Sequence, residues 1–253
     1  MPHEIFLTAV VPDADVTTAR SVLGGVTEMR ERHQFNRVRY MQRQDAGPKT
    51  LDKLKEYYQK ERGPNTVRWQ ELHQILLKQS YILQERISIT QEVMASTGDA
   101  AAIVPPTQSR LLRWNDFPDP SSSRLPTFIT QRKMLEIGDR RLPKILSDTK
   151  FIVKAESVEE SYQWWLNNAE YSLTRTFPLA PGTQQEVPNM AGLEPLAPFW
   201  VLYVRIQVDS NPERMQQGHA QLSRVRDRLL RVFDFKVFDR RAHDTRNMEP
   251  RQL

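Results

Sequence analysis

The chain has 253 residues with 36 Lys or Arg against 31 Asp or Glu, so its formal net charge is +5. That length suits one large domain, and the small positive surplus is typical of an ordinary protein surface. The absence of cysteine excludes disulfides, thiolate metal sites and thiol nucleophiles. No apolar run approaches the roughly 20 residues of a membrane helix, so we expect an intracellular protein without membrane contact.

The first 43 residues predict a strand, a helix and a second strand. Residues 3–11 alternate between two faces with the period of a strand. Pro12 ends this strand, because proline has no backbone N–H to donate to a neighbouring strand. Residues 13–28 carry a helical apolar stripe, and Gly24–Gly25 within it predict a close approach to the sheet. Residues 33–43 return as a strand, with Val38 and Tyr40 on one face.

The next part of the chain mixes polar and apolar segments. Residues 44–66 are polar with Gly-Pro near both ends, which predicts an exposed excursion around a short helix at 51–61. In the run 67–89 the apolar period changes from that of a helix to that of a strand. Residues 93–126 lose periodicity and are rich in proline and serine. They predict a mobile insertion, in which Leu111, Leu112, Trp114 and Phe117 form a local anchor.

The second half predicts hairpins followed by a strand–helix–strand unit. Strands are expected at 127–137, at 151–166 as two strands or one long bent strand, and at 169–177, with a helical turn at 141–146. Asn167–Asn168 suits a type I′ turn, in which both central residues have positive φ. After a proline-rich loop at 179–198 come a strand at 199–208, a helix at 212–232 with Asn211 as its cap, and a strand at 233–239.

Many strands with few helices favour a single domain over 1–253. The fold class is α+β and mostly β, a large, many-stranded antiparallel barrel or strongly curved sheet with a few flanking helices. The first and last strands are expected to be neighbours in one sheet.

A search for catalytic patterns finds none. The five histidines are dispersed, and neither a glycine-rich phosphate loop nor a Gly-x-Ser-x-Gly elbow occurs. Glu159 and Glu160 are adjacent, so on a strand they point to opposite faces, and Glu-x-Glu occurs nowhere. We therefore assign no catalytic, metal or cofactor residues.

Two other groups of residues remain candidates for binding. Trp164–Trp165 place one indole in the core and one outward, so both are candidates for a partner contact. Basic residues near the C-terminus form either a solvated helix face or a nucleic-acid surface: Arg224, Arg226, Arg228, Arg231, Lys236, Arg240, Arg241, Arg246 and Arg251.

Three segments together resemble the fungal type of the Mediator subunit 18 family. HEIFLTAVVPDADVTTARSVLGGVTEM with the following FNRVRYMQR resembles that family's N-terminus, and WQELHQILLKQSYILQERISI resembles its next block. YVRIQV, an amphipathic helix and VFDFKVFDRR match its ending. The similarity covers roughly residues 3–43, 67–92, 127–177 and 199–240.

The resemblance implies a non-enzymatic subunit of the Mediator head module, which is a coactivator of RNA polymerase II in the nucleus. It implies a barrel like that of the tunnel triphosphatases, paired with Mediator subunit 20 and holding a C-terminal helix of subunit 8. Those triphosphatases bind metal through Glu-x-Glu, which this chain lacks, so the fold need not bring the activity with it. A metal-dependent tunnel phosphohydrolase and a basic nucleic-acid-binding protein remain the alternatives.

Overall fold

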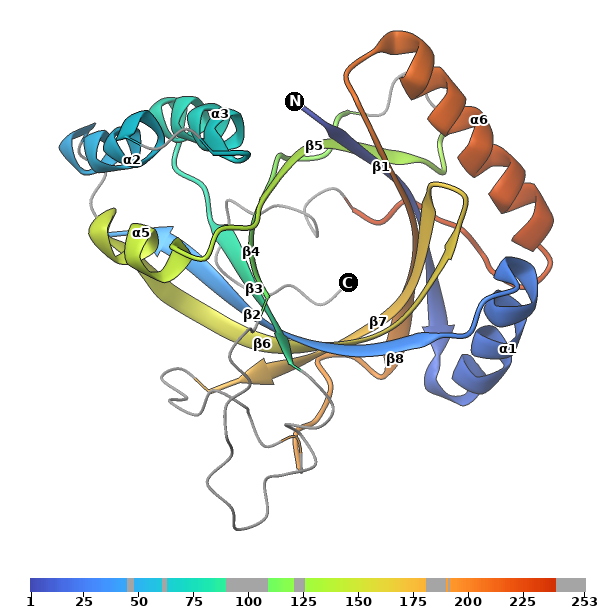
Figure 1. The fold of residues 1–253 in the computed structure, drawn as a ribbon. Helices are drawn as coiled ribbons and strands as arrows, with labels where there is room; N and C mark the ends of the chain where they lie inside the picture. The colour runs from blue at the N-terminus through green and yellow to red at the C-terminus, as the bar shows by residue number, and fades with distance from the viewer. Residues whose placement is uncertain are drawn as a thin grey trace.

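The fold is a closed barrel of antiparallel strands (Figure 1). The computed structural model describes residues 1–44, 48–60, 63–89, 109–120, 126–180, 190 and 192–239. Around the barrel the strands follow the order β1-β5-β4-β3-β2-β6-β7-β8, and β8 pairs with β1 to close it. The strands are β1 (His3–Pro12), β2 (Arg32–Arg43), β3 (Leu83–Ile89), β4 (Arg110–Asn115), β5 (Thr130–Ile137), β6 (Phe151–Leu166), β7 (Ala169–Leu179) and β8 (Phe199–Val208).

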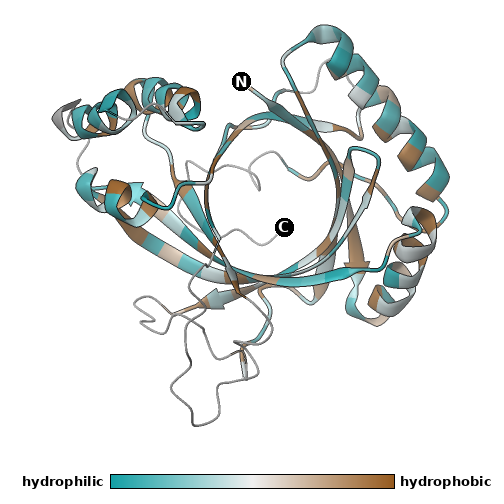
Figure 2. Cartoon of the chain, viewed as in Figure 1, coloured by the Kyte–Doolittle hydropathy of each residue, from teal (hydrophilic) through white to brown (hydrophobic). Residues whose placement is uncertain are grey.

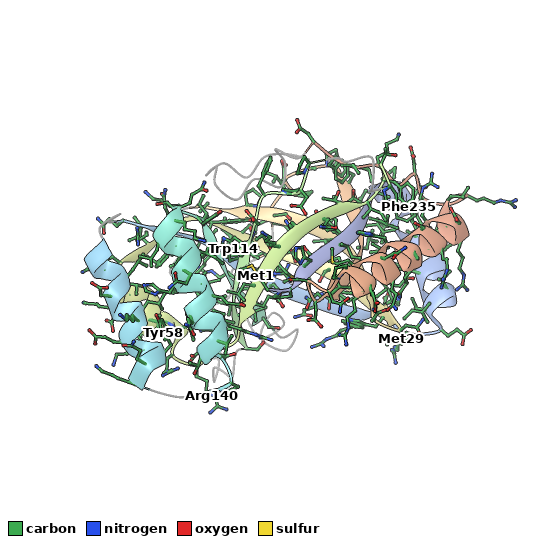
Figure 3. The ribbon with its side chains drawn as sticks, turned by 90° about the horizontal axis from the view of Figure 1, so that it is seen from above. Met1, Met29, Tyr58, Trp114, Arg140 and Phe235 are labelled. Carbon is green, nitrogen blue, oxygen red and sulfur yellow. The ribbon has the colours of Figure 1, made fainter. Side chains whose placement is uncertain are left out.

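Helices cover the outside of the barrel in two groups (Figures 1 and 3). One group is α1 (Val16–Thr27), which follows the short 3-10 turn η1 (Asp13–Asp15), together with α6 (Pro212–Leu229). The other group is α2 (Pro48–Lys60), α3 (Thr66–Lys78) and α5 (Leu142–Asp148). Each group shares a hydrophobic core with the outer face of the strands beneath it. Figure 2 shows apolar and polar residues alternating along α6, as one buried helix face requires.

The alternation of the strands separates two environments. On β1, Ile5, Leu7 and Ala9 point outward into the core beneath the helices. Their neighbours Glu4 and Phe6 point into the lumen, because successive side chains on a strand face opposite ways. Under the two helix groups the outer face of the strands is apolar, whereas charged side chains such as Glu4 and Arg132 face the lumen.

Several predicted elements are confirmed. The strand predicted at 199–208 is β8, and it pairs with β1 from His3 opposite Val208 to Pro12 opposite Phe199. Residues 151–166 form one continuous strand. Asn211 caps α6, since its Oδ1 accepts hydrogen bonds from the Glu213 amide at 2.8 Å and the Arg214 amide at 3.4 Å.

Other predictions were wrong. The mobile insertion expected at 93–126 is interrupted by β4 at 110–115, which pairs with β3 and β5. The local anchor expected within it is present, since Leu112 and Trp114 are buried in the core. Residues 90–108 and 121–125 lie outside the described residues. The helix predicted at 51–61 is present as α2, but the segment 44–66 is not simply an exposed excursion, because Leu51 and Leu54 are buried in the core. Residues 233–239 form only an isolated bridge, Phe235 to Ala9, instead of a strand.

Two details of the backbone also differ from expectation. Asn167 has φ 56°, but Asn168 does not have positive φ, so the turn between β6 and β7 is not type I′. The close approach of helix to sheet occurs at Gly218 of α6. A Cβ there would lie 2.4 Å from Ile5 Cδ1, whereas one at Gly24 would meet only ordinary contacts.

Candidate functional site

The lumen of the barrel is the place where a tunnel enzyme of this architecture would bind its substrate. Within the described residues, the pairing of the strands shows which charged side chains face the lumen. They are Glu4 (β1), Arg86 (β3), Arg113 (β4), Arg132 and Glu136 (β5), Glu159 (β6), Glu170 (β7) and Arg205 (β8). Arg32, exposed at the start of β2 and opposite Gln163 of β6, lies on the same face, so the described wall carries at least as many arginines as glutamates.

On one side of the lumen, the Glu4 carboxylate lies between two arginines, Arg132 and Arg205. Arg132 Nε donates to Glu4 Oε2 at 2.7 Å, and Arg205 Nε lies 3.9 Å from Glu4 Oε1. Arg205 also lies 3.7 Å from Glu170. Glu4 and Arg132 come from neighbouring strands although they are 128 residues apart in the chain.

On the other side, two more pairs join adjacent or nearby strands. Arg113 Nε donates to Glu136 Oε1 at 2.7 Å, between β4 and β5. The Arg86 guanidinium of β3 forms a two-pronged ion pair with Glu159 of β6, with Nη1 at 3.3 Å from Oε2. Every glutamate of the described wall thus has an arginine partner.

The pKa values show that these charges act on one another across the lumen. Burial alone would raise the pKa of the Glu4 carboxyl, but Arg132, Arg205 and Arg113 outweigh it and lower that pKa to about 2. Burial is likewise outweighed at Glu159, whose pKa is lowered by Arg86 first and then by Arg205 and Arg113. Both carboxylates therefore stay ionised at neutral pH, each balanced by guanidinium groups.

This arrangement is unsuited to holding a divalent metal. The described residues contain no group of three or more His, Cys, Asp or Glu side chains placed to share an ion. Glu159 faces the lumen, while Glu160 faces outward, where it contacts His33 Nε2 at 2.9 Å and Arg175 Nη2 at 3.0 Å. The sequence prediction that the two neighbours cannot act together is confirmed, and the lumen carboxylates come from different strands.

A second ionic network crosses the outer face of the barrel. Glu156 on β6 accepts from Arg37 Nε at 3.2 Å and from Arg39 Nε at 3.0 Å, both on β2. Glu85 on β3 lies 3.5 Å from Arg39 and accepts from Arg110 on β4 at 3.0 Å. These pairs connect consecutive strands, so their role is to hold the wall together.

The two tryptophans occupy opposite faces of β6. Trp164 is only 1% exposed and lies in the outer core that α1 covers, which confirms that one indole is a core residue. This burial removes Trp164 as a partner contact, which corrects its place among the binding candidates. Trp165 pairs with Glu170 on the lumen side, is half-buried, and stays a predicted partner contact.

The predicted basic cluster is only partly described. Arg224, Arg228 and Arg231 are exposed, whereas Arg226 is half-buried, with its guanidinium 4.4 Å from the centre of the Phe128 ring. Lys236 pairs with Asp234. The remaining members, Arg240, Arg241, Arg246 and Arg251, lie outside the described residues.

Sequence reasoning missed the ionic network of the lumen, although a signal for it was present. Glu4 is a single acid in an otherwise apolar strand, HEIFLTAVV. Arg205 is likewise the only charged residue in FWVLYVRIQV. An isolated charge in a buried strand needs a counter-charge on a neighbouring strand, because an unpaired buried charge is strongly unfavourable.

No part of any described helix is long and apolar enough to cross a membrane. No curated protein sequence matches the chain.

Comparison with solved structures finds a chain of a Mediator complex with a similar fold. The chain aligns with a chain of the Schizosaccharomyces pombe Mediator head module with a TM-score of 0.63 and 14% identity, over 92% of this chain and 98% of that one. At this identity the match shows a shared fold.

Two further matches score lower. A protein of Pyrococcus horikoshii OT3 aligns with a TM-score of 0.47 and 9% identity, over 93% of this chain and 94% of that one. A putative adenylyl cyclase of Hippeastrum with a dominant triphosphatase activity aligns with a TM-score of 0.43 and 9% identity, over 94% and 93%. We draw no inference about activity from either.

The family comparison is more specific. A family model described as Med18 protein matches residues 3–246, which is nearly the whole chain. The match includes all three segments whose resemblance to the family was noted in the sequence. The chain therefore belongs to the Med18 family.

Proposed function

We propose that this chain is a non-catalytic barrel that works by binding other subunits. Membership of the Med18 family makes it a subunit of the Mediator complex, which acts in transcription, as the sequence predicted. It would act in the nucleus, without catalysis, by contacting individual partner subunits.

The pairing of the lumen carboxylates is the observation that carries the proposal. A metal-dependent phosphohydrolase needs carboxylates free to ligate the ion, usually several at one level of the site. Here Glu4, Glu136, Glu159 and Glu170 each lie beside an arginine. Releasing one of them to a metal would leave a buried guanidinium without its counter-charge.

The proposed partners are Mediator subunit 20 and a C-terminal helix of subunit 8, with RNA polymerase II contacted indirectly. Their support is the family match, because the family resemblance implies both partners. A permanent complex of this kind is expected to bury roughly 2,000 Å² or more. Working in such a complex implies a nuclear protein.

Co-purification tests the binding part of the proposal. The tagged full chain, expressed in its native cell, should retain subunits 8 and 20 through a high-salt wash. Isolation of a stable complex that lacks both subunits would contradict the proposed partners.

A phosphate-release assay tests the catalytic part separately. The purified chain should release no phosphate from tripolyphosphate or nucleoside triphosphates with Mg²⁺ or Mn²⁺. Metal-dependent release that Glu159→Gln abolishes would show that the lumen is an active site and would overturn the non-catalytic assignment.

A further inference from the structure

The strand pairing of the barrel wall is incomplete along one edge of β1. On one side, β1 pairs with β8 along its whole length, from His3 to Pro12. On the other side, it pairs with β5 only as far as Phe6, because β5 begins at the residue opposite, Thr130. From Leu7 onward, no strand of the described residues pairs with this edge. The backbone N–H and C=O groups of an open edge are a template for a further strand.

Residues 233–238, which we call the C-terminal strap, cover part of this open edge. Phe235 forms an antiparallel bridge with Ala9. The Lys236 amide donates to the Thr8 carbonyl at 3.0 Å, and the Thr8 hydroxyl donates to the Lys236 carbonyl at 2.6 Å. The pairing does not continue into a ladder, because the bridge is isolated. The strap therefore lies where an added strand would lie, but it pairs with β1 over a very short length.

Aromatic side chains attach the strap to the rest of the protein. Phe233 and Phe235 are buried in the core under α1 and α6, and the centres of their rings lie 6.1 Å apart. Asp234 and Lys236 are exposed and pair with each other. A segment with an isolated bridge opens at a lower cost in free energy than a strand that is paired along both edges, such as β8. We therefore expect the strap to open while the barrel stays folded.

The strap leaves an aliphatic side chain of β1 uncovered. In the register set by Ala9 and Phe235, Asp234 is the residue opposite Val10. Asp234 offers Val10 no apolar side chain, and Val10 is 43% exposed. An extended segment with an aromatic residue in the place of Phe235 and an aliphatic residue opposite Val10 would bury more apolar surface than the strap does.

We propose that the edge of β1 from Leu7 to Val11 is a site for β-strand addition, which the strap occupies until a partner displaces it. The partner is an extended segment of another protein, with an aromatic residue in the place of Phe235 and an aliphatic residue opposite Val10. The strap itself supports this choice, because its own backbone and aromatic side chain already bind this edge. The site goes beyond the proposed function and does not depend on subunits 8 and 20.

Hydrogen–deuterium exchange of the purified full chain tests whether the strap opens separately. The Lys236 amide should exchange at least about tenfold faster than the paired amides of β8, since its opening does not require the barrel to unfold. Equal exchange rates would show that the strap opens only together with the barrel, and they would overturn the proposal.

Fluorescence anisotropy with labelled peptides tests strand addition itself. The first peptide has the sequence of residues 232–239, VFDFKVFD. A second peptide has Leu at the position of Asp234, and a third has Ala at the position of Phe235. The Leu peptide should bind about threefold or more tighter than the first peptide, because it covers Val10. The Ala peptide should bind about tenfold or more weakly, because it lacks the ring that enters the core.

Variants of the full chain identify the site and the competition. Phe235→Ala removes the buried ring of the strap and should tighten binding of the first peptide about tenfold or more. Lys236→Pro removes the amide donor at an exposed position outside the core, and should tighten binding about threefold or more. Its matched control, Lys236→Ala, keeps the amide and should change affinity less than about twofold. Val10→Ser should cancel the advantage of the Leu peptide.

Three binding results would overturn the proposal. The first is that neither Phe235→Ala nor Lys236→Pro binds the first peptide more tightly than the unchanged chain does. The second is an advantage of the Leu peptide that survives Val10→Ser, which would place the peptide elsewhere on the protein. The third is a dimer of the unchanged chain that the first peptide dissociates, which would make a second copy of the chain the occupant.

Discussion

Replacing Glu4 with glutamine would test whether the lumen network stabilises the barrel. The change removes one negative charge but keeps the size of the side chain. Arg132, whose Nε donates to the carboxylate at 2.7 Å, would lose its only acidic partner in the described lumen, whereas Arg205 would keep Glu170. Removing one member of a buried ion pair costs about 3–5 kcal/mol. We expect the lower end of that range, about 3 kcal/mol, because Arg132 also lies over the Phe6 ring at 5.1 Å.

A double-mutant cycle measures this interaction directly. Urea unfolding, followed by tryptophan fluorescence, would be compared for Glu4→Gln, Arg132→Met and the double variant. The double variant should be more stable than the sum of the single effects predicts, by roughly 1–3 kcal/mol. The matched control is Glu31→Gln, which breaks the more exposed pair with Arg20 and should cost less than about 1 kcal/mol.

Two outcomes would refute the reasoning. If Glu4→Gln costs no more than Glu31→Gln, the lumen pair does not behave as a buried one. If the effects of Glu4→Gln and Arg132→Met simply add, the two side chains do not stabilise each other. The ion pair between them then contributes nothing to the free energy of unfolding.

Three further predictions concern pH, a helix cap and two glycines. The pKa of Glu4 is lowered from 4.5 to about 2 in the fold, so its stabilising effect is complete above pH 4.5 and disappears as the pH falls toward 2; the urea midpoint should fall across that window, and less so in Glu4→Gln. Asn211→Ala should cost about 1 kcal/mol of unfolding free energy, since two amides lose their acceptor, and an unchanged midpoint would contradict the cap. Gly218→Ala should destabilise by about 1 kcal/mol, because its Cβ would meet the buried Ile5 side chain at 2.4 Å, whereas Gly25→Ala, with nothing within 4 Å, should stabilise by up to about 1 kcal/mol. Equal signs for the two glycines in thermal unfolding would contradict that account.

Strands covered by helices were predictable from the sequence. β8 (Phe199–Val208) matches its expected bounds, because the strand is apolar over most of its length and its outer residues pack in the core under the helices. The capped start of α6 was also predictable, since Asn211 and Pro212 are local signals. The residues that determine these elements lie close together in the sequence.

Elements that depend on distant pairing were not predictable in this way. β4 has six residues next to proline-rich segments, and both of its faces carry leucine, so no clear alternation marks it as a strand. It is held in place by β3 and β5. The ion pairs of the lumen depend in the same way on barrel register, which joins Glu4 to a residue 128 positions away.

The pairing of β1 with β8 also affects how the protein can be made. β1 leaves the ribosome first, but its longest partner follows roughly 200 residues later, so the newly made strand must wait for most of the chain. During that interval Ile5, Leu7 and Ala9 lack the neighbours that later bury them. Such distant contacts predict slow folding and a need for chaperones during synthesis. Nascent chains that stop before Phe199 should therefore be captured by chaperones, whereas chains that extend past Phe235 should be released.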